Sequence, residues 1–309
     1  MEWNVENLYD TLHDVGFDDR EFLPNAERRW NTPRYFRKQS SLAKTILAAG
    51  GLQPVDLVAL CEVENDSVMH FLCHRTRLAR LGYEYLVTHS ADRRGIDVAL
   101  LYQPETFALL HSETYRVPYD SLRERPTRDL LHAAGRLPFG DTLDVFVVHF
   151  PSRRGGATIS EPYRLRAAGI LRHLADSIAR HRHTPRLLAM GDFNDEPHNA
   201  SVSRVLAPTF AELTSHATPL PAEGHDDIEG SYYFRGEWSR IDQILVSPTL
   251  LSPTMKFHTT PQSVHLLAFP PLLEPLGRGT LSKPFRTYLG PFYHGGISDH
   301  LPLCVDFSY

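Results

Sequence analysis

An acid and an amide follow a short apolar run in the segment LLAMGDFNDE. An apolar run of this length between turn residues is typical of a buried strand, and Gly191 allows the chain to turn sharply at its end. Open α/β folds keep their reactive groups at such strand ends. Asp192 and Asn194 are therefore candidate catalytic residues, and the alternative is an acidic turn that caps the next helix. We interpret the adjacent Asp195 and Glu196 as the ordinary acidic start of the following segment.

Oxygen-bearing side chains also cluster near the start of the chain, where Asn4, Glu6 and Asn7 follow a β-type segment. Amide and carboxylate oxygens are the ligands that hard divalent cations prefer. The alternative is a capped turn, because such side chains commonly satisfy nearby backbone groups. Glu62 is a sharper candidate than these three residues, since it directly ends the apolar strand expected over residues 56–61.

A histidine and two arginines mark the end of another apolar segment, LDVFVVHF, which runs into PSRRGG. A histidine that closes an apolar strand is often a hydrogen-bonded core residue, but His149 also titrates in the range that suits an acid or a base. Arg153 and Arg154 favour the functional interpretation, because arginines pair naturally with phosphate oxygens. The glycines after them allow a ligand to approach the backbone closely.

The second half of the chain adds an acid and a histidine that could work as a pair. Asp242 lies inside an apolar run, where a buried acid needs a hydrogen-bond partner. Asp299 and His300 come just before the last strand, and an acid that orients a histidine is a recurring catalytic device. Ser298 next to His300 does not indicate a serine hydrolase, since no G-x-S-x-G motif surrounds it.

The elements that must position these side chains follow from hydrophobic periodicity. The pattern predicts helices over residues 34–49 and 67–81, a helix capped by Ser160, and strands over residues 56–61, 83–88, 96–102, 143–150 and 241–246. Asp97 within one strand must be paired or face an edge, and Arg93 and Arg94 are equally suited to pair with it or to contact the substrate. Residues 261–296 are rich in proline and glycine and are expected to form a long loop, whose aromatics could stack on a base, face a lipid or line the loop itself.

Composition limits the class of protein. The 309 residues are 42% hydrophobic and 22% charged, which is typical of a globular chain of one large domain or two smaller ones. No apolar stretch is long enough to cross a bilayer, so no membrane insertion is expected. The net charge of −5 gives no overall attraction to nucleic acid or to an anionic membrane. The three cysteines, Cys61, Cys73 and Cys304, are expected to be free buried thiols.

The compartment is left open. Only three residues precede Asn4, which is very little for a strand inside a sheet, so we expect upstream residues to have been removed. A signal peptide could have stood there, and both a cytoplasmic and an exported protein agree with the sequence.

Six motifs, taken in order, resemble the endonuclease/exonuclease/phosphatase superfamily: NVEN, LCEVEN, VVHFPSRRGG, GDFNDEP, RIDQILVS and GGISDHLP. The resemblance spans nearly the whole chain and is strongest to the bacterial branch with NVENLFD and HFPSRRGG signatures. It implies a deoxyribonuclease-I-like α+β fold, a four-layer α/β/β/α sandwich of two mainly antiparallel sheets flanked by helices. It also implies a single domain over residues 1–309, with two similar halves that divide near residue 160 and a site at the strand ends.

The resemblance further implies a bound metal ion. Glu62 would be the main ligand of Mg²⁺ or Mn²⁺, with Asn4 beside it and Asp299 nearby. Oxygen ligands of this kind suit a hard cation that keeps several waters and also binds phosphate. Some nucleases of the superfamily carry an aspartate where this chain has Glu6, so a ligand role for Glu6 is left open.

Catalytic roles carry over to the matching positions. Asp192 would orient and deprotonate the attacking water, while Asn194 would hold the phosphate. His300, aligned by Asp242, would donate to the phosphoryl oxygens as negative charge develops there. His149 would contact the phosphate and assist the leaving oxygen, a form of acid catalysis that contributes roughly 10²- to 10⁴-fold in rate.

The sequence therefore predicts a monomeric, metal-dependent hydrolase of phosphate esters, most consistent with a phosphodiesterase or nuclease, in which Asn7, Arg153 and Arg154 bind the substrate. A phosphomonoesterase, or a phosphatase of phospholipids or inositol phosphates, is the alternative within the superfamily. A non-catalytic binding module on this fold is the rival from another class, and it disagrees with the complete set of site residues. The negative net charge disfavours a tight duplex binder, although arginines and aromatics could hold a short single strand.

Overall fold

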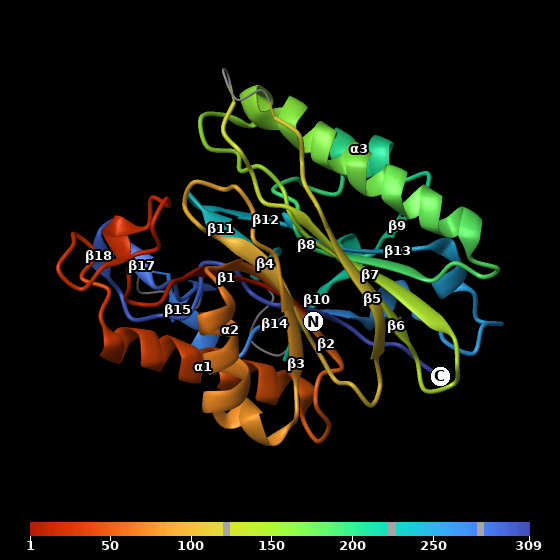
Figure 1. Cartoon of the computed structure of the whole chain (residues 1–309), viewed down its shortest axis with the longest axis horizontal. Helices are drawn as coiled ribbons and strands as arrows, with labels where there is room; N and C mark the ends of the chain where they lie inside the picture. The colour runs from red at the N-terminus through yellow and green to blue at the C-terminus, as the bar shows by residue number, and fades with distance from the viewer. Residues whose placement is uncertain (120–123, 222–226, 277–280) are drawn as a thin grey trace.

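Two β-sheets stack face to face in the computed structural model, with helices on the outer side of each sheet (Figure 1). The structure describes residues 1–119, 124–221, 227–276 and 281–309. The helices are α1 (Thr32–Gly50), α2 (Asp66–Arg75) and α3 (Ala157–His181). Helices α1 and α2 lie on one side of the sandwich and α3 on the other (Figure 1). The predicted α/β/β/α order of layers is therefore confirmed.

The first sheet contains both the beginning and the end of the chain. Its strands are β1 (Glu2–Leu8), β2 (Leu57–Val63), β3 (Glu84–Val87), β4 (Asp97–Tyr102), β10 (Thr218–Leu220), β14 (Val264–Leu267) and β19 (Leu303–Val305). The spatial order is β10-β14-β19-β1-β2-β4-β3. The pairs β1/β2 and β10/β14 are parallel and the other pairs are antiparallel. The carboxyl ends of β1 and β2 consequently meet at one edge of the sheet.

The second sheet repeats this mixed arrangement. Its strands are β5 (Ala108–Tyr115), β6 (Leu130–Arg136), β7 (Thr142–His149), β8 (Leu187–Asp192), β9 (Ala211–Glu212) and β13 (Asp242–Val246). The spatial order is β5-β6-β7-β8-β13-β9, in which only the pair β7/β8 is parallel. The carboxyl ends of β7 and β8 are thus also brought side by side.

Short ribbons and helical turns complete the described chain. The ribbons pair β11 (Tyr232–Phe234) with β12 (Glu237–Ser239), β15 (Leu273–Pro275) with β16 (Ser282–Pro284), and β17 (Tyr288–Leu289) with β18 (Phe292–Tyr293). The turns are η1 (Arg20–Phe22), η2 (Arg77–Arg80), η3 (Ser201–Leu206), η4 (Thr214–His216), η5 (Pro248–Leu251), η6 (Pro261–Ser263) and η7 (Pro270–Leu272). The segment 261–296, expected as one long loop, is therefore largely built of these pieces, and its residues 277–280 lie outside the described residues.

Strand β8 shows why the central segments read as continuous apolar runs. Successive side chains of a strand point to opposite faces. Leu188 and Met190 join the core shared with the first sheet, whereas Leu187 and Ala189 pack in the cluster beneath α3. Both faces of the strand are covered, so no polar alternation is needed.

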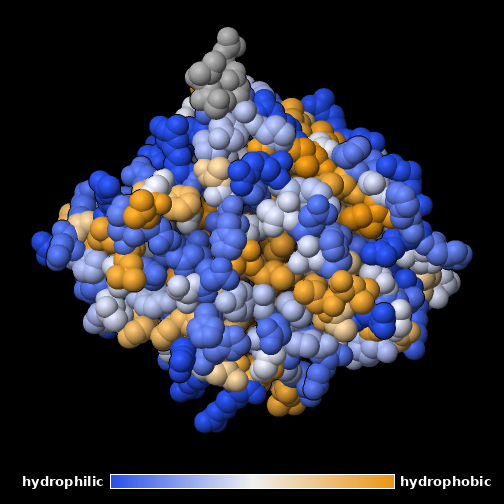
Figure 2. Space-filling model, in the orientation of Figure 1, coloured by the Kyte–Doolittle hydropathy of each residue, from blue (hydrophilic) through white to orange (hydrophobic). Residues whose placement is uncertain are grey.

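The surface in Figure 2 is mainly hydrophilic, with separate apolar patches.

One local expectation is wrong. Helix α3 begins at Ala157 rather than after Ser160, and the Ser160 hydroxyl instead donates to the Gly156 carbonyl at 2.9 Å within the first turns. A serine in that position satisfies its hydroxyl on the preceding turn, which removes the need for a cap. Residue 160 thus lies inside α3, and the division of the chain into two similar halves near this residue stays a prediction.

Cys61, Cys73 and Cys304 are free thiols as expected, although Cys304 is only partly buried. None of the described helices combines the length and the hydropathy that a membrane crossing requires.

The buried acid Asp97 gives a prediction for stability. Its Oδ1 accepts hydrogen bonds from Thr88 Oγ1 at 2.6 Å and from Ser90 N at 2.9 Å, so neither Arg93 nor Arg94 is its hydrogen-bond partner. Burial raises the pKa of Asp97 from 3.8 to about 6, against the effect of these hydrogen bonds. A raised folded-state pKa disfavours the charged form, so stability is lost as the pH rises from below 3.8 to above about 6.

Asp97→Asn keeps an oxygen acceptor without the charge. We expect the wild type to lose about 2 to 3 kcal/mol relative to this variant across that pH window, measured by urea unfolding at several pH values. The exposed Asp306→Asn serves as the control. A difference between wild type and Asp97→Asn that does not change with pH would contradict the prediction.

Candidate functional site

Three candidate residues lie in one row across the second sheet. The strand register places Asp192 of β8 directly between His149 of β7 and Asp242 of β13. Each of the three strands is a buried, mainly apolar segment, and the residue in the row is its first or last, so the sheet holds the three side chains rigidly at these strand ends. The predicted strand ends therefore converge.

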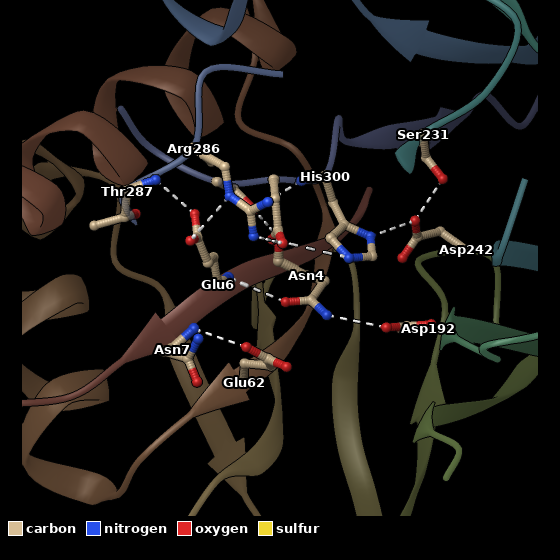
Figure 3. A network of polar contacts seen from close by, with 12 residues as sticks. Asn4, Glu6, Asn7, Glu62, Asp192, Ser231, Asp242, Arg286, Thr287 and His300 are labelled. Carbon is tan, nitrogen blue, oxygen red and sulfur yellow. Dashed lines mark hydrogen bonds and ion pairs between the residues drawn. The ribbon is translucent and has the colours of Figure 1, made fainter. Parts of the chain in front are cut away.

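Asp242 and His300 form the predicted pair. His300 Nδ1 lies 2.7 Å from Asp242 Oδ2, which also accepts from the Ser231 hydroxyl (Figure 3). The Tyr232 ring lies against the imidazole, with centroids 4.6 Å apart. Burial alone would lower the pKa of His300, but the carboxylates of Asp242, Asp299 and Asp192 together outweigh it and raise the pKa well above its ordinary value. Ser231 and Tyr232 carry no motif that sequence reasoning could have used.

Asp192 lies at one side of the polar network in Figure 3, where a hydrogen bond joins it to Asn4. Its Oδ1 accepts from the backbone N–H of Asn194 at 2.8 Å, and its Oδ2 accepts from Asn4 Nδ2 at 3.0 Å. His149 Nε2 lies 3.5 Å from the same Oδ2. Burial, and next the charge of Asp242, raise the pKa of Asp192 to about 7. The carboxylate is thus held in place and favours accepting a proton near neutral pH.

His149 is buried and its Nδ1 has no hydrogen-bond partner among the described residues. Burial, assisted by the charge of Arg128, lowers the pKa of His149 well below its ordinary value. The ring is consequently neutral at physiological pH, where it can donate an N–H hydrogen bond but carries no positive charge.

The ends of β1 and β2, and the turn after β8, have an irregular backbone at their polar residues. The register of β1 against β2 shifts between Asn4 and Leu8, and that of β2 against β4 shifts around Glu62. Glu62, Asn7 and Asn194 all have left-handed backbones, with φ of 66°, 55° and 50°. Bulges and left-handed residues of this kind redirect side chains and concentrate at functional sites.

Glu62 accepts at Oε2 from the backbone N–H of Asn7 at 2.8 Å, and its Oε1 lies 3.9 Å from Arg94 Nη1. Its side chain is partly exposed. Asn7 therefore contributes its backbone to the position of Glu62, and the role predicted for its side chain in substrate binding stays a prediction.

The Glu6 carboxylate makes hydrogen bonds within the fold, unlike the more accessible carboxylate of Glu62. Its carboxylate accepts from the backbone N–H groups of Thr287 at 2.6 Å and Tyr288 at 3.3 Å, and it lies 3.7 Å from Arg286 Nε. Buried Lys38 donates to both the Glu6 carbonyl and the Thr287 hydroxyl. These contacts commit Glu6 to anchoring the segment after β16, so it is poorly available as a metal ligand.

Asp299 pairs with Arg286, whose Nη2 lies 2.7 Å from its Oδ2. Asp299 and Glu62 side chains are both partly exposed, and Asn4 lies between Glu62 and Asp192 in Figure 3. Two carboxylates with access to solvent, beside the amide oxygen of the buried Asn4, suit a hard cation that keeps part of its water shell. These three residues therefore fit a divalent metal ion.

A second group of possible ligands is Asp192, Asp242 and His300, whose ligand atoms lie within 4.8 Å of one another. All three side chains are buried, and His300 already uses Nδ1 on Asp242. A cation that keeps several waters suits this enclosed group less well than the group that contains the partly exposed Glu62 and Asp299.

The two arginines after β7, Arg153 and Arg154, differ in their contacts and exposure. Arg153 Nε donates to the Asn194 carbonyl at 2.7 Å and its Nη2 donates to Asn199 Oδ1 at 2.7 Å, so it braces the loop after β8. Arg154 is exposed. Substrate binding by these two arginines stays a prediction.

Asp195 is more than the acidic start of a segment, which corrects the expectation. It is buried, with Oδ1 2.7 Å from Arg164 Nε and Oδ2 accepting from Ser201 at 2.7 Å. Removal of one partner of a buried ion pair is strongly destabilising. The spacing between Asp195 and Arg164 hides this pair from sequence reasoning. Glu196 accepts from the backbone N–H of Arg240 at 3.1 Å.

Gly191 gives a prediction about the turn that exposes Asp192. Its φ is 143°, and an added Cβ would lie 1.8 Å from the Val148 carbonyl oxygen on the neighbouring strand. We expect Gly191→Ala to destabilise the fold by about 4 kcal/mol or more, through strain and overpacking together. Gly169→Ala in α3 is the matched control, because an added Cβ there meets nothing within 4 Å. Equal melting temperatures for the two variants would refute the prediction.

Known proteins share this architecture. The family model described as "Endonuclease/Exonuclease/phosphatase family" matches residues 1–308. No curated protein matches the chain. A Bacteroides vulgatus endonuclease/exonuclease/phosphatase is 14% identical, with a TM-score of 0.63 over 99% of this chain and 97% of that chain.

Two other solved structures have the same fold. The Bacteroides thetaiotaomicron mannosyl-6-phosphatase is 14% identical, with a TM-score of 0.62 over 100% of this chain and 98% of that chain. D. rerio TDP2, solved with a single-strand DNA product, is 16% identical, with a TM-score of 0.59 over 100% of this chain and 97% of that chain. At these identities the likeness establishes the fold.

Proposed function

Because this chain belongs to the endonuclease/exonuclease/phosphatase family, and is thereby a hydrolase of phosphate esters, we propose that it is a divalent-metal-dependent phosphodiesterase. The observation that carries the proposal is the convergence of Asp192, His149 and the Asp242–His300 pair on one sheet edge. A base, two nitrogen donors and an adjacent group of oxygen ligands are what water attack on phosphorus requires.

Glu62, Asn4 and Asp299 would hold Mg²⁺ or Mn²⁺. When bound, the ion neutralises charge on the phosphate oxygens. Arg286 also contributes positive charge at this site, because its guanidinium lies between the carboxylates of Asp299 and Glu6.

Asp192 receives the proton of the attacking water. Its Oδ2 lies next to His149 Nε2, and the hydrogen bonds from Asn4 and Asn194 fix the orientation of the carboxylate. Asn194 Nδ2 donates to the Phe150 carbonyl at 3.1 Å, which leaves its second N–H for a phosphate oxygen. A fixed base and a fixed donor lower the reorganisation that the reaction requires.

The two histidines supply donors to the phosphoryl group. Nδ1 of His300 is committed to Asp242, so Nε2, which lies 4.0 Å from Asp299 Oδ1, is the nitrogen that faces the substrate. His149 donates an N–H from the neighbouring strand. Donors fixed at the position where negative charge develops are usually the largest single contribution to such a reaction.

The test is hydrolysis of bis(p-nitrophenyl) phosphate and of p-nitrophenyl phosphate in ¹⁸O-labelled water with MgCl₂. We expect the diester to react faster and the label to enter the phosphate product, since water attacks phosphorus. Label in the nitrophenol would refute attack on phosphorus, and a faster monoester reaction would favour the phosphomonoesterase alternative.

A further inference from the structure

A pocket lies beside the proposed active site, between the β11–β12 ribbon and the β15–β16 ribbon. Its volume is about 340 Å³, which falls within the usual range for ligand pockets of roughly 300 to 1,000 Å³. The side chains that bear on its chemistry are Tyr233, Phe234, Arg235, Lys283, Arg286 and Asp299.

The pocket is continuous with the proposed active site. Arg286 and Asp299 line it, and the same two residues form the ion pair next to Glu6 and the His300 imidazole. A substrate whose phosphate contacts Asn194 and the histidines can therefore extend a substituent into this pocket.

A row of aromatic rings leads from His300 in the proposed active site to Phe234 in the pocket. The Tyr232 ring lies 4.6 Å from that of His300, and the Phe234 ring stacks on Tyr232 with centroids 6.1 Å apart and planes 16° apart. Phe234 is 51% exposed, and the Arg235 guanidinium lies 5.2 Å from its ring centroid. An exposed ring next to a guanidinium is a surface on which a planar aromatic group can stack.

The charge of the pocket is positive. Three of its lining side chains are cations, Arg235, Lys283 and Arg286, against the single acid Asp299. Lys283 is partly neutralised by Glu274 at 3.4 Å, and Arg286 by Asp299 at 2.7 Å. Within the described residues, Arg235 makes no ion pair. A positive charge that no acid neutralises in the described part of the chain, beside an exposed aromatic ring, favours a ligand that is both planar and anionic.

We propose that this pocket is a second substrate subsite, in which Phe234 stacks on an aromatic ring and Arg235 binds a second anionic group of the same substrate. The inference rests on the proposed function, because the reacting phosphate occupies the site beside Asp192. It identifies the preferred substrate class as a phosphate ester of a phosphorylated nucleoside, in which a base supplies the ring and a further phosphate supplies the charge.

The first test measures binding without catalysis. Thymidine 3′,5′-bisphosphate is titrated calorimetrically into metal-free protein in EDTA, with inositol 1,4-bisphosphate as the ligand that has the charges but no aromatic ring. We expect the thymidine ligand to bind at least about tenfold more tightly than the inositol ligand, and Phe234→Ala and Arg235→Gln each to weaken it about tenfold. Arg80→Gln, on η2, is the matched control and should bind normally.

Equal binding of the two ligands, or unchanged binding in both pocket variants, would overturn the proposal. Both substituted residues are exposed, so melting temperatures near that of the wild type are expected and are measured first.

The second test measures preference. The p-nitrophenyl ester of thymidine 5′-phosphate is compared with the same ester carrying a 3′-phosphate, and we expect kcat/KM to favour the latter by about tenfold in wild type and to lose this ratio in Arg235→Gln. Hydrolysis of both esters with a ratio near one overturns the subsite alone. Tight, Phe234-dependent binding by a protein that hydrolyses neither ester supports the subsite and refutes the proposed activity.

Discussion

Asp192→Asn is expected to lower kcat for diester hydrolysis by roughly 10³-fold while the fold remains intact. The amide cannot take a proton from water, yet it has nearly the same shape as the carboxylate. Its oxygen can still accept the hydrogen bond that Asn194 donates from its backbone at 2.8 Å. The loss should appear in kcat more than in KM, because the substrate contacts of His149 and His300 are retained.

The measurement is steady-state hydrolysis together with thermal melting. The matched control is Asp306→Asn, which removes an exposed carboxylate after the last strand and should retain activity. A kcat for Asp192→Asn within a few-fold of wild type would remove Asp192 from the mechanism. A large fall in melting temperature would show instead that the Asn4 hydrogen bond matters mainly for folding.

Chelation should abolish activity, and Mg²⁺ or Mn²⁺ should restore it. Glu62→Gln should then raise the metal concentration that gives half-maximal activity by at least about tenfold, because the variant replaces a charged ligand by a neutral one. The Asn7 backbone N–H can still donate to the glutamine oxygen, so the end of β2 should keep its shape.

Glu105→Gln is the matched control for this experiment. Glu105 is exposed, and its substitution removes the same charge from another part of the surface. Full activity in EDTA would refute a metal role. If Glu62→Gln needs no more metal than the wild type, the enzyme still depends on a metal ion but Glu62 is not its ligand. The alternative group of ligands is then Asp192, Asp242 and His300.

Much of the fold and the centre of the site were accessible from the sequence, for a physical reason. Strands covered on both faces appear as uninterrupted apolar runs, so a polar residue that ends such a run stands out. Glu62, His149 and Asp192 were found in this way. The pairing of Asp242 with His300 was predicted from the need to satisfy a buried acid, and the 2.7 Å distance between them confirms it.

The supporting residues could not be found in this way, because their partners are distant in sequence. Glu6 is bound by Thr287 and Tyr288 across the whole length of the chain, and no local pattern encodes that contact. The segment that carries Arg286 contains many turn residues, so periodicity predicted a single loop there. Asp195 was misread for the same reason, since Arg164 lies on a helix that precedes it.

The place of β19 has a consequence for how the protein is made. This last strand lies beside β1, and the turn before it carries Asp299 and His300. The segment from β1 to β19 must therefore have left the ribosome before the first sheet can form fully, and His300 must have left it before it can pair with Asp242. A chain that ends before the turn to β19 lacks Asp299 and His300, and we expect it to be inactive toward phosphate esters. Contacts so distant in sequence also form slowly, which makes the closing of this sheet a candidate for the rate-limiting step of folding.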